Sequence, residues 1–226
     1  RGLLLNELWL LYPGTVNSPY AEIANGRKSI YASAYQCSFE DGVQKFKKVV
    51  KDRNMNSIVI DMKDDYGFLR YDTHDPLVMK KGAVSSYAIK DLNKFIEEFK
   101  KENIYLIARI VTFKDRSLSK YENGKYAVWD SKQNKPWVGI KGLEDGQTAY
   151  YDEHWVDPYS EEVWEYNVAI AKELIARGFD EIQFDYIRFP TDGTNLYNAK
   201  YRWQDKGMDK ESALISFLSY ARENIK

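Results

Sequence analysis

The chain has 226 residues, enough for one domain with a sizeable core, and its 44% hydrophobic content is typical of water-soluble proteins. Its 33 Lys and Arg residues against 34 Asp and Glu residues give a formal net charge of −1. This balance excludes the strongly basic surface of proteins that bind nucleic acids or anionic membranes. A single cysteine, Cys37, excludes an internal disulfide, and no spacing of Cys and His indicates a metal site or a cofactor.

Residues 1–28 are predicted to form an irregular arm that covers one end of a single domain, residues 29–226. The longest hydrophobic run of the arm is interrupted by Asn6 and Glu7 and is too short to span a bilayer. The run also lacks the layout of a signal peptide, so any leader is expected to have been removed already.

The first strand is predicted over residues 29–35, where hydrophobic side chains alternate with more polar ones, and Tyr31 falls on the more polar face. Ser38 followed by Asp41 resembles a capping box, which marks the start of a helix. The hydrophobic face that follows predicts that this helix runs up to Asn54.

The second strand is predicted over residues 57–65. Its period of two places Asp61 and Lys63 together on one face, opposite a row of hydrophobic side chains. A second hydrophobic face, over residues 89–101, predicts a helix that ends at two lysines, where cations suit the helix C-terminus.

The third strand is predicted over residues 105–115, with Arg109 on its polar face. Residues 113–156 then show no helical or strand periodicity, and a connection of roughly forty residues indicates a functional loop. The aromatic residues and the histidine of this loop are Tyr121, Tyr126, Trp129, Trp137, Tyr150, Tyr151, His154 and Trp155. We expect one or two of them to contact a ligand and the others to pack the loop onto the domain.

The Asp-Pro pair that begins at Asp157 predicts the start of the third helix, and Gly178 predicts its end. The fourth strand follows over residues 181–185, and its polar row ends at Asp185. A last helix is predicted around residues 213–221, where a further hydrophobic face occurs.

The order is therefore strand then helix, four times over, which predicts an α/β fold with parallel strands and right-handed crossovers. A (β/α)₈ TIM barrel has eight such units, so residues 29–226 are predicted to be the N-terminal half of a barrel. Either the sheet is open, or the other half comes from a missing segment or a second copy of the chain. In such barrels the active site lies at the carboxyl ends of the strands.

The polar side chains at these strand ends suit glycoside hydrolysis, in which two carboxylates flank the scissile bond. Asp185 and Asp61 are the candidate catalytic carboxylates, and Asp65 and Asp115 lie on adjoining loops. The candidate substrate-binding residues are Lys63, Asp64, Arg109, Arg188, Trp129, Trp137 and Trp155.

The two candidate catalytic residues could instead have purely structural roles. Asp185 alternatively accepts a hydrogen bond from Arg188 or caps the following turn, and Asp61 alternatively forms an ion pair with Lys63 or Arg109 that fills the barrel. For Asp157, the proline that follows favours helix capping over a role in catalysis.

Four motifs carry a family resemblance: VIDMKDDYG at residues 59–67, IARIVTFKD at 107–115, WVDPY at 155–159, and FDEIQFDYIRFPTDG at 179–193. Together they resemble the "putative glycosyl hydrolase domain" family, a TIM-barrel group of the glycosidase clan that was formerly of unknown function. The resemblance implies a glycoside hydrolase, retaining or inverting, with Asp185 as a catalytic carboxylate. Family members continue past the fourth helix with four more strands, which do not follow in this sequence.

Two other functions remain open. A carbohydrate-binding barrel without catalysis has the aromatic loop but no working pair of carboxylates. A metal-dependent polysaccharide deacetylase needs clustered His and Asp ligands, whereas His74 and His154 are far apart in the sequence. Because polysaccharides lie mostly outside cells, an extracellular or cell-envelope location is expected.

Overall fold

The computed structural model describes residues 25–225, so most of the predicted arm, residues 1–24, lies outside the described part of the chain. The four predicted strands are present and pair in parallel, in the order β1–β2–β5–β10. They are β1 (Ser29–Ala32), β2 (Ser57–Lys63), β5 (Tyr105–Val111) and β10 (Glu181–Asp185). Their carboxyl ends therefore meet at one edge of the sheet, as a barrel-type site requires.

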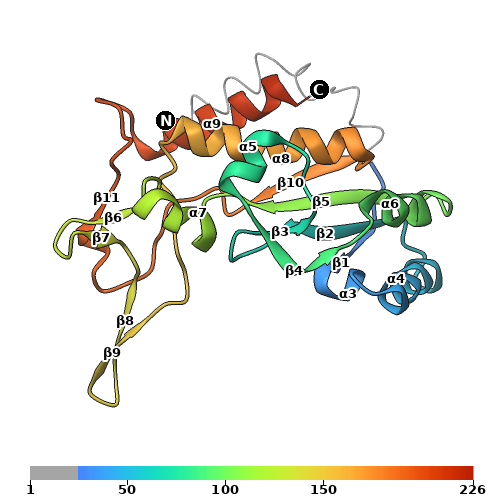
Figure 1. Cartoon of the computed structure of the whole chain (residues 1–226), viewed down its shortest axis with the longest axis horizontal. Coiled ribbons are helices and arrows are strands. Elements are labelled where there is room, and N and C mark those ends of the chain that lie inside the picture. The colour runs from blue at the N-terminus through green and yellow to red at the C-terminus, as the bar shows by residue number, and fades with distance from the viewer. Residues whose placement is uncertain (1–24, 226) are drawn as a thin grey trace.

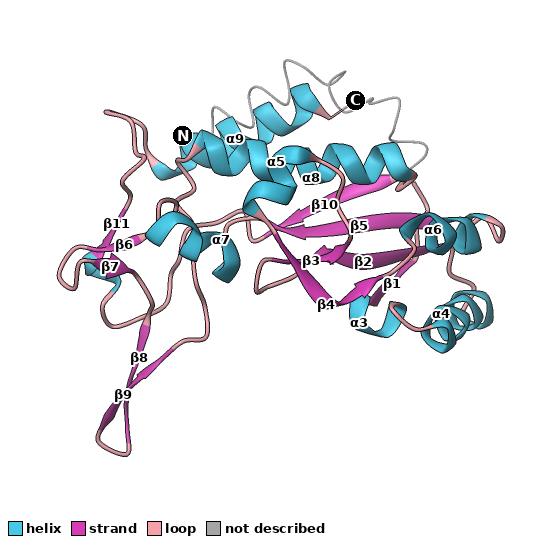
Figure 2. Ribbon diagram, viewed as in Figure 1, coloured by secondary structure: helices cyan, strands magenta, loops and turns pink. Residues whose placement is uncertain are grey.

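Four long helices follow these strands in the predicted alternation (Figures 1 and 2). They are α4 (Glu40–Asp52), α6 (Leu92–Lys100), α8 (Glu161–Arg177) and α9 (Lys210–Asn224). Alternate strand residues such as Ile60, Ala108 and Ile110 are fully buried and belong to the core that these helices share with the sheet. The opposite face of the strands is the one that carries the polar row.

Between β2 and α6 the chain forms three elements that were not predicted: β3 (Phe68–Tyr71), α5 (Pro76–Lys81) and β4 (Ala83–Ile89). Strand β3 turns back antiparallel to β2, and β4 pairs in parallel with β3. The first strand is also shorter than predicted, because the chain after Ala32 turns into α3 (Ala34–Cys37), whose N-cap is Ser33.

The expectation that residues 113–156 contain no regular structure is wrong. The elements there are α7 (Arg116–Lys120), η2 (Tyr121–Asn123), β6 (Trp129–Asp130), β7 (Lys135–Pro136), β8 (Ile140–Glu144) and β9 (Gln147–Tyr150). The hairpin β8–β9 extends away from the rest of the molecule (Figure 1). After β10, η3 (Leu196–Asn198) leads into β11 (Ala199–Lys200), which pairs with β6. Elements of two to five residues are too short to produce a recognisable period.

Two predicted helix starts are also wrong. The N-cap of α4 is Phe39, without a side-chain hydrogen bond, and Ser38 Oγ instead donates to the carbonyl of Tyr87 at 2.6 Å. Helix α8 begins after Ser160, and Asp157 is a buried residue that accepts the N–H of Trp203 at 3.0 Å. Burial raises the pKa of Asp157 to about 6. Gly178 ends α8 as predicted, with φ of 118°.

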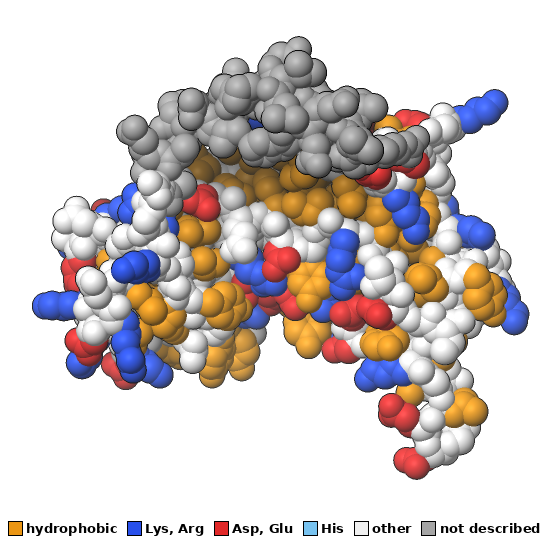
Figure 3. Space-filling model, turned by 180° about the vertical axis from the view of Figure 1, so that it is seen from behind, with side chains coloured by type: hydrophobic (Ala, Val, Ile, Leu, Met, Phe, Trp, Pro, Cys, Tyr) orange, Lys and Arg blue, Asp and Glu red, His pale blue; other side chains and the backbone are white. Residues whose placement is uncertain are grey.

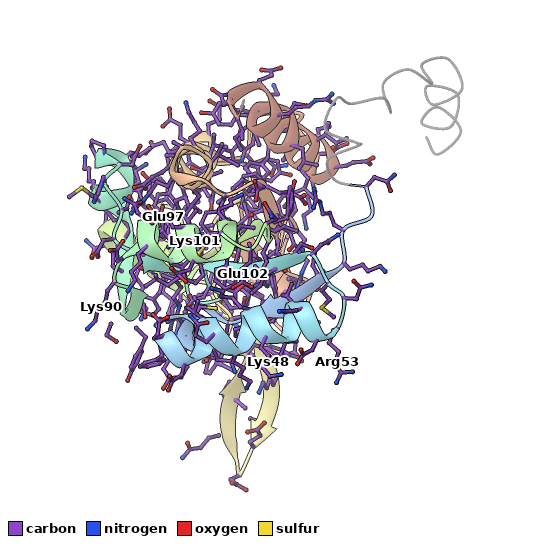
Figure 4. All side chains as sticks on the ribbon, turned by 90° about the vertical axis from the view of Figure 1, so that its right-hand side faces the viewer. Lys48, Arg53, Lys90, Glu97, Lys101 and Glu102 are labelled. Carbon is purple, nitrogen blue, oxygen red and sulfur yellow. The ribbon has the colours of Figure 1, made fainter. Side chains whose placement is uncertain are left out.

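The outer surfaces of α4 and α6 are charged, and an ion-pair network joins the two helices. Lys47 Nζ lies 3.1 Å from Glu98 Oε2 and 2.7 Å from Glu102 Oε1. Figure 4 labels exposed residues of this surface: Lys48, Arg53, Lys90, Glu97, Lys101 and Glu102. The network links helices whose hydrophobic faces are already buried.

Glu162, in the first turn of α8, is expected to make stability depend on pH in acid. Hydrogen bonds from Tyr126 and Lys125 lower the pKa of Glu162 from 4.5 to about 2. Because the folded pKa is below the unfolded one, this stabilisation is present above pH 4.5 and is lost as the pH falls towards 2. Thermal unfolding followed by circular dichroism from pH 6 to 2 should show a shallower fall in Tm for Glu162→Gln than for the wild type. Glu165→Gln, an exposed position on the same helix, should retain the wild-type slope.

Candidate active site

Three neighbouring strands bring Asp61, Arg109 and Asp185 into direct contact. Asp61 of β2 and Gln183 of β10 are the cross-strand partners of Arg109 on β5. Arg109 Nη1 donates to Asp61 Oδ1 at 2.7 Å, and Arg109 Nε donates to Asp185 Oδ2 at 2.8 Å. The three side chains lie on the face opposite the buried Ala108. The arginine therefore connects the two predicted carboxylates.

Two further residues complete this carboxylate cluster, which consists of Tyr31, Asp61, Asp65, Arg109 and Asp185. Arg109 Nη2 lies 3.3 Å from Asp65 Oδ1, and the Tyr31 hydroxyl donates to Asp61 Oδ2. Burial acts to lower the pKa of Arg109, but the hydrogen bonds that Arg109 donates to its carboxylate partners, together with their charges, prevail and raise the pKa above its ordinary value. Burial and the bond to Asp61 raise the pKa of Tyr31, so it remains a protonated donor. On the face seen in Figure 3, acidic and basic side chains lie beside hydrophobic ones.

Asp185 is the accessible carboxylate of the central pair. Its side chain is 41% exposed, against 11% for Asp61. Both Asp185 oxygens are nevertheless held, because Oδ2 accepts from Arg109 and Oδ1 accepts the N–H of Tyr186 at 2.7 Å. Arg188 donates instead to the carbonyl of Phe189 and to Thr191, so the structure favours Arg109, not Arg188, as the partner of Asp185. The ion pair between Asp61 and Arg109, open from the sequence, is present.

Tyr186, directly after Asp185, has a left-handed backbone with φ of 53°. This conformation is unfavourable for a bulky side chain, and such strain is concentrated at functional sites. The tyrosine ring lies under two cations, with Lys114 Nζ at 4.8 Å and the Arg188 guanidinium at 5.3 Å from its centre. The backbone N–H of this tyrosine is the group that donates to Asp185 Oδ1.

The prediction that Lys63 shares the face of Asp61 is wrong. A β-bulge lies between the two residues, so that Asp61 pairs with Arg109 while Lys63 pairs with the next residue, Ile110. The extra residue turns Lys63 into the core, where its side chain is fully buried and Nζ lies 2.7 Å from Asp115 Oδ2. Lys63 thus lies away from the cluster and does not face a substrate.

Asp64 shapes the turn that follows β2. Its Oδ1 accepts the N–H groups of Tyr66 and Phe68, both at 2.9 Å, and its Oδ2 accepts from Arg70. The side chain is 9% exposed, so the predicted contact between Asp64 and substrate has little surface available. The turn positions the neighbouring Asp65 towards Arg109.

Gly67 in this turn is expected to be irreplaceable. Its φ is +80°, and a Cβ there would lie 1.8 Å from Asp115 Oδ1, in a carboxylate that the buried Lys63 holds in place. Gly67→Ala should therefore lower the free energy of unfolding by more than about 1 kcal/mol, measured by urea denaturation. Gly146→Ala is the matched control, because φ is +75° but no atom lies within 4 Å. Equal losses in the two variants would contradict the clash with Asp115.

The three predicted tryptophans are mainly packing residues. Trp155 and Trp137 are each 2% exposed, and Trp137 Nε1 donates to the carbonyl of Asn195. The Arg188 guanidinium lies 4.6 Å from the Trp155 ring centre and covers it. Trp129 is half-buried, with the Arg202 guanidinium 4.0 Å from its ring centre. Close cations thus occupy the faces of Trp129 and Trp155.

The two histidines lie on separate segments, as expected. The backbone N–H of His74 donates to Glu173, and the carbonyl of His154 accepts from Asp115. Within residues 25–225, no group of three or more His, Cys, Asp or Glu side chains is arranged to hold a metal ion.

No helix in the described part of the chain is both long and hydrophobic enough to cross a membrane.

Sequence reasoning did not identify Lys114 and Tyr186 as parts of this region. Lys114 Nζ lies 3.5 Å from Asp65 Oδ2, and Tyr186 donates to Asp185. The sequence signal that could have identified them is their position, because each follows closely after the carboxyl end of a strand, β5 or β10. Tyr31 carried the same signal as Asp61, a position on the polar face of its strand.

A family model described as "Putative glycosyl hydrolase domain" matches residues 29–226. Among solved structures, a hypothetical protein from Ruminiclostridium thermocellum ATCC 27405 is 31% identical, with a TM-score of 0.72. The match covers 87% of this chain and 93% of that one. No curated protein matches the chain.

More distant solved structures include two glycosidases. α-L-Fucosidase isoenzyme 2 from Paenibacillus thiaminolyticus is 15% identical with a TM-score of 0.55, and the match covers 88% of this chain and 30% of that one. An α-galactosidase from Thermus thermophilus is 13% identical with a TM-score of 0.51, over 89% of this chain and 37% of that one. These similarities show a TIM-barrel-like α/β fold, and the chain spans about a third of each enzyme.

Proposed function

The chain belongs to the "putative glycosyl hydrolase domain" family, and we propose from this membership that it hydrolyses glycosidic bonds in an oligosaccharide or polysaccharide, with Asp185 as a catalytic carboxylate. One observation carries the proposal. Asp185 is held at both oxygens by Arg109 and the Tyr186 N–H, yet 41% of its side chain is open to solvent. A fixed and accessible carboxylate is what a nucleophile or general base requires.

The other residues of the cluster receive distinct roles. Arg109 donates to Asp185 Oδ2, and this hydrogen bond fixes the orientation of the carboxylate, as a nucleophile or base requires. Asp61 is 11% exposed and both its oxygens are occupied, by Arg109 and Tyr31. We therefore assign Asp61 to positioning Arg109. Asp65, with a side chain 39% exposed, is the second accessible carboxylate of the cluster.

The proposal extends to architecture and location. Strands β1, β2, β5 and β10 are proposed to be the first four of a (β/α)₈ barrel, because they are parallel and lie side by side in the sheet in the order in which they occur along the chain. The remaining strands would come from a further segment or from a second copy of the chain. A polysaccharide substrate favours an extracellular or cell-envelope location.

Release of reducing ends from bacterial and plant polysaccharides, together with binding of the same glycans, tests this function. The proposal predicts turnover of at least one glycan and its loss in Asp185→Asn. Binding with no turnover in the whole protein would instead support the rival function, a carbohydrate-binding barrel.

A further inference from the structure

A cavity of about 380 Å³ lies within the long connection between β5 and α8. Its walls come from α7, the β6–β7 hairpin and the segment that begins at Tyr150 of β9. In Figure 1 these elements occupy the end of the molecule opposite α4. The volume falls in the range of about 300–1,000 Å³ that is typical of small-molecule sites.

The lining suits a sugar. Tyr150 and Tyr151 supply aromatic surface, and Tyr150 is 43% exposed. Gln133 offers both a donor and an acceptor, while Val138 adds an apolar patch. Aromatic faces together with neutral hydrogen-bonding groups match the apolar faces and hydroxyl edges of a saccharide ring.

The charges of the lining balance. The lining contains two cations, Arg116 and Lys135, and two anions, Asp130 and Asp152, and Arg116 Nη1 lies 3.4 Å from Asp152 Oδ1. Arg116 Nε is buried and has no hydrogen-bond partner among the described residues. Burial and then nearby cations lower the pKa of His154, so its neutral ring offers one donor and one acceptor. A balanced lining favours an uncharged ligand.

The carboxylate cluster is linked to the wall of the cavity through one side chain. Lys114 connects the two, because its Nζ lies 3.5 Å from Asp65 Oδ2 and 3.3 Å from Glu153 Oε1. Glu153 stands between two residues of the cavity wall, Asp152 and His154. Lys114 therefore contacts both the cluster and the segment that lines the cavity.

We propose that this cavity binds a neutral sugar unit of an extended glycan whose scissile bond lies at Asp185. This inference rests on the proposed hydrolase function and adds to it a second place that binds a sugar unit, lined by residues outside the carboxylate cluster. Affinity should consequently increase with chain length.

Isothermal titration of the whole protein with maltohexaose, cellohexaose and chitohexaose, and with glucose and N-acetylglucosamine, tests the inference. At least one hexasaccharide should bind about tenfold or more tightly than its monosaccharide. Tyr150→Ala should raise the Kd of that hexasaccharide about tenfold, and Gln133→Ala, at an exposed turn, should raise it about threefold. Tyr197→Ala is the matched control, because Tyr197 is 72% exposed and lies outside the cavity lining.

The inference is overturned if no hexasaccharide binds at millimolar concentration, or if folded Tyr150→Ala and Gln133→Ala bind as the wild type does. Reducing-end release on the same sugars separates the two proposals. Turnover that neither variant changes at any chain length would contradict glycan binding in the cavity, while the proposed hydrolase function would stand. Binding that both variants weaken, without any turnover, would support glycan binding in the cavity and contradict the proposed hydrolase function.

Discussion

Replacing Lys63 with methionine is expected to lower the free energy of unfolding by about 3–5 kcal/mol, because it leaves Asp115 charged and unpaired in the core. Both side chains are fully buried, and their charged atoms lie 2.7 Å apart. Lys63 Nζ also donates to the carbonyl of Val111 at 2.7 Å and to Asn167 Oδ1 at 3.0 Å. The variant therefore removes the link between β2, β5 and α8. Urea denaturation followed by tryptophan fluorescence measures the loss.

Lys48→Met is the matched control for this prediction. Lys48 forms an ion pair with Asp52 one turn along α4, with a side chain 74% exposed. Exposed pairs of this kind contribute about 0.3–0.5 kcal/mol, so the control should remain close to the wild type. A loss of less than about 1 kcal/mol in Lys63→Met would show that the buried pair does not hold the core as described.

The sequence predicted the centre of the candidate site because strands have a fixed period. Counting by two placed Asp61, Arg109 and Asp185 on one face of three strands, and the structure brings the three side chains into contact. The same count failed for Lys63, since one extra residue in a bulge reverses every later side chain. A bulge leaves no mark in a short polar segment, so its position could not be read from the residues.

Ambiguous local signals explain other differences. An Asp followed by Pro occurs both at helix starts and in turns, and Asp157 belongs to a turn in which it accepts the N–H of Tyr159. The left-handed backbone of Tyr186 was unpredictable, because a tyrosine disfavours it and only its surroundings impose it. Tertiary contacts determine these features, and a single sequence does not contain them.

Asp185→Asn is expected to lower turnover by about 10²- to 10⁴-fold, the range for removal of a catalytic acid or base. The amide retains the shape of the carboxylate but removes its charge and one of its two acceptors, so glycan binding should change little, while stability should fall by the loss of one hydrogen bond. Asp61→Asn should reduce turnover less, since it acts through Arg109. Asp145→Asn, at an exposed turn with a backbone that asparagine tolerates, is the control and should match the wild type.

The initial rate of reducing-end release by Asp185→Asn, relative to the wild type at equal concentrations of folded protein, tests the central claim most directly. The account predicts that less than about one hundredth of the wild-type rate remains, while the Kd for the glycan stays within about threefold. A variant that retains more than about a tenth of the rate, a change of under about 1.4 kcal/mol in the barrier, would contradict a catalytic role for Asp185.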